Sequence, residues 1–223
     1  MITYPRILPT WVSQVSMSVE ESDQMASTIP LPSTRTSSPR ERQRDYRVGR
    51  YCAMLALEQI GVPRFIPGAN EHGGPLWPPG TVGSITHAMG FASAAVALRS
   101  RCQGIGIDFE PVRSFERAEA LAQEVAASTE VAGIMHSAKI DFASAVTLII
   151  SAKHSLYKCL QPQLGGRSFS YLDCLIDEAP VASGLFRARL MTTLSVSWQR
   201  GTMVTGQVET TPDYVHTGIA LAY

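Results

Sequence analysis

The sequence predicts an α+β fold, in which helices and strands do not alternate regularly. Two long segments, 39–60 and 139–160, have the apolar spacing of amphipathic helices. Two short apolar runs stand between them, and the chain after residue 168 is a series of strand-like segments. This order of helix, loop, strands, helices and strands differs from the regular βαβ alternation that builds a parallel sheet.

The first helix is predicted to follow a polar tract. Residues 28–39 are rich in Ser, Thr and Pro, which indicates a loop. Ser38 is typical of a helix N-cap, and Pro39 of the first helical position. We expect this helix to end at Gly61, because glycine favours the turn that closes a helix.

The segment 62–83 is rich in Gly and Pro, which predicts a long ordered loop pinned to the core by Trp77. The apolar runs 91–99 and 104–112 follow, and we expect them to be adjacent strands. The break at 104–113 divides the chain into nearly equal halves. We therefore expect two subdomains, 1–107 and 108–223.

In the second half, 116–128 and 139–160 are predicted to be helices. The predicted strands of this half are 169–177, 185–194, 196–200, 203–210 and 214–223. Gly201 and Thr202 indicate a hairpin turn between the third and fourth of these strands.

Composition excludes several classes of protein. With 19 basic and 19 acidic residues, no global charge favours nucleic acid or an anionic membrane. No apolar run approaches the ~18 residues of a membrane span, and the N-terminus lacks the pattern of a secretory signal. The four cysteines form no CxxC pair, so we expect reduced, mostly buried thiols and a cytoplasmic protein.

Asp108 and Glu110 stand two residues apart at the end of a predicted strand, with Phe109 between them. Alternation places both carboxylates on one face, where they can converge on a hard cation such as Mg²⁺. The alternative is a solvated strand end without a ligand.

Helix 139–160 carries a cationic cluster. His154 and Lys158 share one face by their i, i+4 spacing, and Lys153 lies on a neighbouring face. Such a cluster suits a phosphate-bearing ligand, with His154 as a proton acceptor. The alternative is a helix end whose lysines only favour the helix dipole.

Two further features are candidates for anion binding. The segment 83–87 is expected to be a loop whose hydroxyls and His87 contact a phosphate. The first helix carries Arg40, Arg44 and Arg47 on one face, with Arg50 one turn beyond. These arginines form either a solvated basic face or an anion site.

Four motifs together resemble the 4′-phosphopantetheinyl transferases, specifically the larger monomeric branch found with siderophore and nonribosomal-peptide synthetases. The matching stretches are RDYRVGRYCAMLAL, PLWPPGTVGSITH, GIGIDFEPV and SAKHSLYK, in family order across residues 40–160. The resemblance implies two similar α/β subdomains with the active site in the cleft between them. It also implies an enzyme that transfers 4′-phosphopantetheine from coenzyme A to a serine of an apo carrier protein.

The resemblance implies a role for each matching residue. Asp108 and Glu110 would bind Mg²⁺, or Mn²⁺, on the coenzyme A pyrophosphate. Lys158 would stabilise that pyrophosphate as it breaks, and Lys153 would lie beside the phosphates. The residues implied at the adenosine 3′-phosphate are Thr86, His87, Arg47 and Arg50.

The chain departs from the family pattern at His154, where the family has a metal-binding Glu that is also a proposed base. Gly74 also replaces the Lys or Arg of many relatives, so one phosphate contact is expected to be missing. The leading hypothesis is an active transferase that is monomeric and binds neither nucleic acid nor membrane. The alternatives are a diverged relative without ordinary transfer activity and an unrelated α+β binding module.

Overall fold

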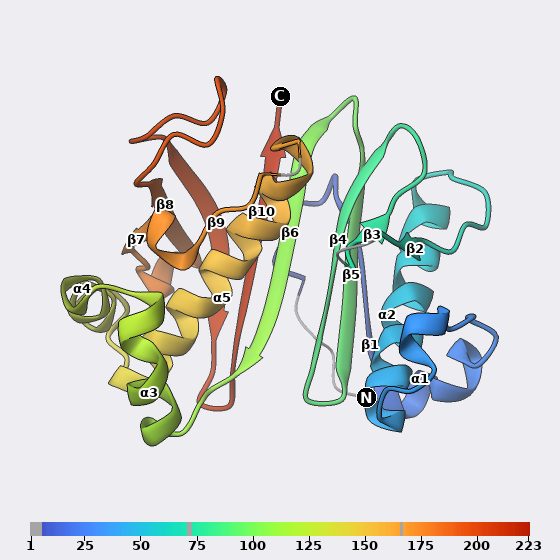
Figure 1. The fold of residues 1–223 in the computed structure, drawn as a ribbon, viewed down its shortest axis with the longest axis horizontal. Helices are drawn as coiled ribbons and strands as arrows, with labels where there is room; N and C mark the ends of the chain where they lie inside the picture. Colours follow the sequence, from blue (N-terminus) through green and yellow to red (C-terminus); the bar gives the residue numbers. More distant parts are fainter. Residues whose placement is uncertain (1–5, 71–72, 166) are drawn as a thin grey trace. The chain divides into compact units, whose positions relative to one another are not determined.

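The computed structural model describes residues 6–70, 73–165 and 167–223. It confirms the α+β class, because helices and antiparallel sheets both occur without regular alternation (Figure 1). The chain folds into two compact units: unit 1 combines the residues up to Ile105 with Ala220–Tyr223, and unit 2 is Gly106–Ile219. The subdomain boundary expected between residues 107 and 108 stays a prediction.

Unit 1 is a three-stranded antiparallel sheet covered by a long helix. Its elements are β1 (Ser13–Ser18), α1 (Val19–Ala26), η1 (Ser33–Arg35), α2 (Arg40–Gln59), β2 (Gly68–Ala69), β3 (Pro75–Leu76), β4 (Thr81–Ala88), β5 (Phe91–Leu98) and the start of β6 (Cys102–Pro111). The strand order is β1-β5-β4. The expectation that β5 and β6 are adjacent is therefore wrong, because β1 and β4 occupy both edges of β5.

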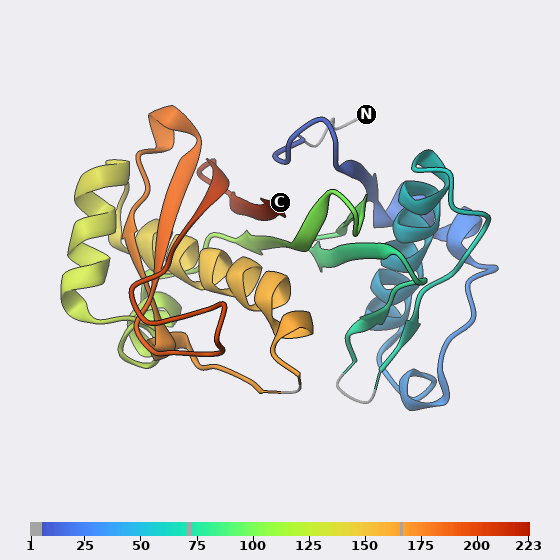
Figure 2. The ribbon, with the colours of Figure 1, turned by 90° about the horizontal axis from the view of Figure 1, so that it is seen from above.

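The core of unit 1 lies between α2 and this sheet. Cys52 and Ala53 of α2 pack against Ala92 and Ala94 of β5, and Figure 2 shows α2 beside the β4–β5 hairpin. Small side chains let the helix approach closely. At Gly49 of α2, an added Cβ would lie 2.9 Å from a methyl group of Ile85.

Helix α2 begins at Arg40, one residue later than predicted, and its N-cap is Pro39 without a side-chain hydrogen bond. Instead of Ser38 capping the helix, the Gln43 side chain donates to the Ser38 carbonyl at 2.8 Å. The predicted stop is confirmed: Gly61 has φ of +82°, and its N–H bonds back to the Glu58 carbonyl at 3.0 Å.

The segment predicted as loop contains short strands β2 and β3 and the start of β4, while residues 71 and 72 lie outside the described residues. Residues 83–87, also predicted as loop, form part of β4. Gly83 is required there, because an added Cβ would lie 2.7 Å from both the Trp77 ring and the Ala95 carbonyl. Trp77 packs on the core of unit 1 as expected.

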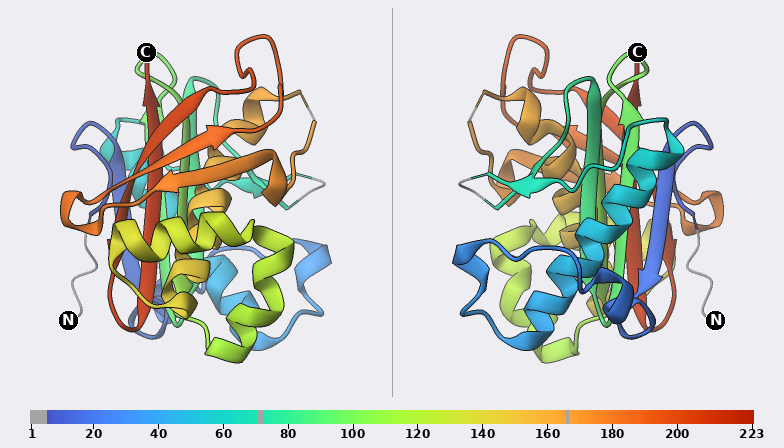
Figure 3. Two further views of the ribbon diagram at one scale, coloured as in Figure 1. Left: turned by 90° about the vertical axis from the view of Figure 1, so that its left-hand side faces the viewer. Right: turned by 90° about the vertical axis from the view of Figure 1, so that its right-hand side faces the viewer.

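Unit 2 contains the rest of β6, three helices and most of a five-stranded sheet of order β6-β10-β9-β8-β7. Its elements are α3 (Phe115–Val125), α4 (Ser128–Ala138), α5 (Phe142–Leu160), η2 (Gln161–Gln163), η3 (Tyr171–Asp173), β7 (Cys174–Glu178), η4 (Val181–Ser183), β8 (Leu185–Leu190), β9 (Met203–Thr210) and β10 (Tyr214–Ala222). Helices α3 and α4 both pack against α5, and Figure 3 shows the two helices in yellow-green.

The predictions for unit 2 need several corrections. The predicted strands 169–177 and 185–194 are shorter, because residues 171–173 form η3 and β8 ends at Leu190. Helix α4 is absent from the predicted elements; it ends at Ala138, and the left-handed C-cap Lys139, with φ of 57°, separates it from α5. Residues 196–200 are not a strand. Gly201 and Thr202 do not form a tight hairpin turn either. They are the last two residues of a long connection, residues 191–202, between the paired strands β8 and β9.

Helix α5 is almost wholly buried. It lies along the strands of unit 2 (Figure 1) and is hydrogen-bonded to them. Ser151 and Ser155 each lie 2.8 Å from the Thr217 hydroxyl on β10. At Gly106 of β6, an added Cβ would lie 1.8 Å from the Ser155 carbonyl oxygen, so only glycine fits. This contact sets the register of α5 and so the position of its polar residues.

Within the described residues, no single helix is long and apolar enough to cross a membrane. Helices α4 and α5 together meet the criteria of length and composition, but the chain bends by 105° between them.

Candidate functional site

The acidic half of the site lies on β6. Asp108 is 4% exposed and Glu110 is partly buried, and both carboxylates approach the same imidazole. Phe109 turns the other way and stacks on Tyr214, with ring centroids 4.8 Å apart. The strand alternation predicted from the sequence therefore holds, and Asp108 and Glu110 do share a face.

The cationic half lies on α5, where His154 and Lys158 are one turn apart. Lys158 Nζ donates to Asp108 Oδ1 at 2.7 Å and to the Ile107 carbonyl at 3.0 Å. His154 Nδ1 lies 3.4 Å from Asp108 Oδ2 and 3.5 Å from Glu110 Oε1. The structure thus brings together four of the side chains predicted for the site.

The charges of this group shift the pKa of two members. Burial alone would raise the pKa of Asp108, but the Lys158 ammonium and His154 outweigh it and lower the pKa to about 2. Burial alone would lower the pKa of His154, but the two carboxylates raise it to about 9. His154 is therefore an imidazolium at neutral pH, not the free proton acceptor that the sequence predicts.

Asp108, Glu110 and His154 form a donor set that fits a divalent cation. One ligand atom from each lies within 4.8 Å of the other two. Asp108 Oδ2 is buried, and among the described residues its nearest polar contact is the ion pair with His154 Nδ1 at 3.4 Å, so it is open to a further ligand. Carboxylate oxygens suit Mg²⁺, and an imidazole nitrogen moves the preference toward softer ions such as Mn²⁺.

The site has one further charged member that the sequence analysis missed. Arg113 Nη2 donates to Glu110 Oε2 at 2.9 Å, so one oxygen of Glu110 is held by the protein while the other faces His154. The i, i+3 spacing of Glu110 and Arg113 was visible in the sequence.

Lys153 does not face this group. Its side chain is 2% exposed, and Nζ donates to the Val125 carbonyl at 2.8 Å, to the Tyr171 carbonyl at 2.9 Å and to Glu130 at 3.0 Å. An ammonium has three donors, and all three are engaged. This buried ion pair replaces the phosphate contact expected for Lys153.

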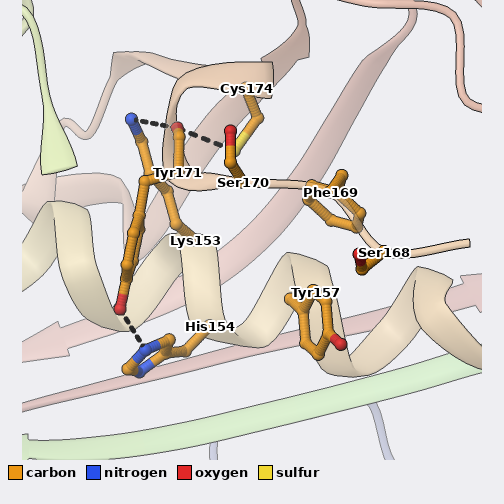
Figure 4. Close-up of a pocket in the computed structure, with 8 residues that line it drawn as sticks. All are labelled: Lys153, His154, Tyr157, Ser168, Phe169, Ser170, Tyr171 and Cys174. Carbon is orange, nitrogen blue, oxygen red and sulfur yellow. Dashed lines mark hydrogen bonds between the residues drawn. The ribbon is translucent and has the colours of Figure 1, made fainter. Parts of the chain in front are cut away.

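A pocket of about 330 Å³ lies beside His154 (Figure 4). Its lining residues are Lys153, His154, Tyr157, Ser168, Phe169, Ser170, Tyr171 and Cys174. Tyr157 and Phe169 contact each other with ring centroids 5.3 Å apart. Tyr171 points its hydroxyl at His154 Nε2, at 2.5 Å, a contact that no sequence pattern indicated.

In unit 1, Arg47 and Arg50 turn inward from α2. Arg47 Nε donates to the Ile29 carbonyl at 3.2 Å. Arg50 is buried, with its guanidinium 4.7 Å from the Tyr46 ring centroid and Nη2 3.3 Å from the Gly68 carbonyl. The alternative of one solvated basic face is therefore wrong for these two arginines.

The other two residues predicted for the adenosine phosphate lie on β4. Thr86 is buried, and His87 is exposed with Nδ1 3.8 Å from Asp45 Oδ2 on α2. That these unit 1 residues share one ligand with the acidic group of unit 2 stays a prediction.

Two family models match the chain. Residues 32–97 match the 4'-phosphopantetheinyl transferase N-terminal domain, and residues 104–217 match the 4'-phosphopantetheinyl transferase superfamily. The second match covers about half of the chain. The hypothesis of an unrelated binding module is therefore wrong.

Curated relatives support the same family. Enterobactin synthase component D of Salmonella typhi is 38% identical over 61% of this chain and 56% of its own length. 4'-Phosphopantetheinyl transferase Npt of Nocardia iowensis is 49% identical over 33% of each chain. The chain thus spans about half of the first relative and a third of the second.

4'-Phosphopantetheinyl transferase Svp of Streptomyces mobaraensis aligns more fully, with 30% identity over 83% of this chain and 75% of its own length. From the two family matches and this alignment, the chain belongs to the 4'-phosphopantetheinyl transferase superfamily.

Proposed function

We propose that the protein is a 4′-phosphopantetheinyl transferase that uses coenzyme A and modifies a serine of an apo carrier protein. In this reaction the serine oxygen bonds to the phosphorus next to pantetheine, the diphosphate bond breaks, and adenosine 3′,5′-bisphosphate leaves. The serine loses its hydroxyl proton. The observation that carries the proposal is the meeting of Asp108 and Glu110 with His154 and Lys158 in a member of this superfamily.

The site chemistry suits phosphoryl transfer, which needs positioning and neutralisation of negative charge. Lys158 already lies at the acidic group and would stabilise the charge that develops on the leaving phosphate. A divalent cation held by Asp108, Glu110 and His154, which we propose to be Mg²⁺ or Mn²⁺, would neutralise the diphosphate. His154 carries a proton in the resting protein, so a role as base requires that proton to leave first.

We propose that Arg47, Arg50, Thr86 and His87 bind the adenosine 3′-phosphate. The buried Arg50 Nε, which has no hydrogen-bond partner among the described residues, supports this role for Arg50. We further propose a cytoplasmic monomer, in keeping with four free, buried cysteines. The carrier would belong to a nonribosomal-peptide, siderophore or polyketide pathway.

A second candidate function is that of a diverged member that binds coenzyme A or a carrier without ordinary transfer. The contact of His154 with both carboxylates favours it, because an imidazolium there competes with a bound metal ion.

The test is incubation with coenzyme A and an apo carrier protein, with Mg²⁺ or Mn²⁺, followed by intact-mass measurement. A mass gain of one phosphopantetheine on the carrier supports the transferase. Coenzyme A binding without this gain supports the diverged member, and transfer restored in His154→Glu would then assign the cause to His154.

The variant Asp108→Ala tests whether Asp108 is needed for transfer. It removes the partner of Lys158 and the buried Oδ2, and we expect transfer to fall by roughly 100-fold or more. Asp177→Ala is the control, because Asp177 pairs with Arg189 at the surface of unit 2. Near-native turnover in Asp108→Ala would reject the assignment of Asp108 to the metal site.

A further inference from the structure

Tyr171 is the first residue of the short helix η3, and two sets of hydrogen bonds fix its backbone. Ser170 and Asp173 cap this helix, with Ser170 N–H donating to Asp173 Oδ2 at 2.7 Å. Lys153 Nζ donates to the Tyr171 carbonyl at 2.9 Å from within its buried pair with Glu130. The backbone of Tyr171 is therefore anchored to the interior of unit 2.

The two nitrogens of His154 face different kinds of group. Nδ1 faces the carboxylates of Asp108 and Glu110, which only accept hydrogen bonds. Nε2 lies 2.5 Å from the Tyr171 hydroxyl, which both donates and accepts (Figure 4). The hydroxyl can therefore keep this hydrogen bond whether or not Nε2 carries a proton.

We propose that Tyr171 is a positioning residue, whose hydroxyl anchors Nε2 of His154 and so holds Nδ1 toward Asp108 and Glu110. The side chain of His154 is 35% exposed, so packing alone does not fix its ring. Groups that bond the far nitrogen of a metal-binding imidazole set its orientation. This inference deepens the site on which the proposed function rests, and it names the partner that accompanies His154.

The test compares Tyr171→Phe with Tyr157→Phe. Tyr157 lines the same pocket and contacts Phe169, so its variant loses a hydroxyl without touching the His154 contact. The first readout is the ring Nδ1–H signal of His154 in protein labelled with ¹⁵N-histidine. We expect a slowly exchanging signal in wild type and Tyr157→Phe that is lost in Tyr171→Phe, with both variants folded.

The second readout is the affinity for Mn²⁺ in the absence of substrate. Tyr171→Phe should weaken Mn²⁺ binding by roughly 10- to 100-fold, the usual effect of removing a group that orients a ligand, and Tyr157→Phe should not. In a His154→Glu background, Tyr171→Phe should no longer change the affinity. An equal loss in that background would show a merely structural role and overturn the proposal.

The outcomes separate this inference from the proposed function. If Tyr171→Phe matches Tyr157→Phe in both readouts, Tyr171 is not a positioning residue. The proposed transferase function still stands in that case, because it does not depend on Tyr171. If wild type binds no Mn²⁺, the metal assignment fails, and the Nδ1–H signal alone decides on Tyr171: its loss in Tyr171→Phe supports the inference, and its persistence overturns it.

Discussion

Lys153 and Lys158 lie on the same helix, yet their surroundings give them different roles. Lys158 is about one-third exposed and meets Asp108 at the acidic group. Lys153 is paired with Glu130, both at 2% exposure, and Glu130 Oε1 accepts from the Ile176 N–H at 2.8 Å. Burial raises the pKa of Glu130, and the Lys153 ammonium opposes this rise. Lys153 thus joins α5 to α3, α4 and η3, and Glu130 joins α4 to β7.

Lys153→Met should destabilise the protein by about 3–5 kcal/mol, because Glu130 would stay buried without its counter-charge. Urea unfolding measures this loss. Lys139→Met is the control, since Lys139 is exposed, and its effect should stay within about 0.5 kcal/mol. If Lys153→Met were as stable as Lys139→Met but bound coenzyme A weakly, the phosphate contact expected from the sequence would be right after all.

The sequence predicted the members of the site better than their contacts. Strand alternation paired Asp108 with Glu110, and helical spacing paired His154 with Lys158. That the strand meets the helix followed only from the family resemblance. The contact of Tyr171 with His154 was not predictable, because Tyr171 lies on the short helix η3, in the connection between α5 and β7. Lys153 was misplaced because helical periodicity gives the face of a residue and not what covers it.

At the scale of elements, the site depends on how closely α5 approaches β6. At Gly106, the nearest atoms to an added Cβ are backbone atoms, the Ser155 carbonyl oxygen at 1.8 Å and the Cys159 nitrogen at 2.8 Å. Neither can rotate away as the end of a side chain can. Glycine at this position therefore allows His154 and Lys158 to reach the carboxylates of β6.

Gly106→Ala should destabilise unit 2 by about 3 kcal/mol or more, because α5 must move to accommodate the methyl group. Mn²⁺ affinity should fall with it. Gly133→Ala is the matched control, since Gly133 lies within α4 with nothing within 4 Å of an added Cβ. That variant should gain about 0.5–1 kcal/mol from helix propensity. Unfolding curves for both variants decide the matter, and a stable Gly106→Ala would contradict the close approach.

The elements that the sequence analysis missed share a physical cause. Strand β4 contains Gly83, which predicts a loop in the sequence but allows close packing against Trp77 in the structure. Helix α4 has no side-chain N-cap, and its interior glycine weakens the helical pattern. In both places tertiary packing overrides local propensity, whereas α2 and α5 were predictable because their apolar stripes are long.

At the scale of the whole molecule, the two units repeat one arrangement. In each, a long helix packs on an antiparallel sheet, α2 on the sheet of β1, β5 and β4, and α5 on strands β6–β10. Glycine allows the close approach in both, at Gly49 and at Gly106. This repetition accords with the two similar subdomains implied by the family.

Two histidines of unit 2 should give the stability of the molecule a pH dependence of opposite sign. His216 is fully buried, and burial lowers its pKa from 6.5 to about 4. Between these values the unfolded chain binds a proton that the folded state excludes, so stability rises with pH. His154 has its pKa raised from 6.5 to about 9. Between those values the folded state keeps a proton that the unfolded chain has lost, so stability falls as pH rises.

We therefore expect His216→Asn to flatten the acid side of the stability profile, removing about 3 kcal/mol of variation between pH 4 and 6.5. His154→Gln should leave that side unchanged and flatten the range from 6.5 to 9. Free energies of unfolding measured in urea across both ranges, each compared with wild type, test the two effects separately. The comparison of slopes is independent of any uniform loss that a substitution causes. An acid slope that survives in His216→Asn would contradict the exclusion of a proton from His216 in the folded state. An alkaline slope that survives in His154→Gln would contradict the retention of the imidazolium by the carboxylates of β6.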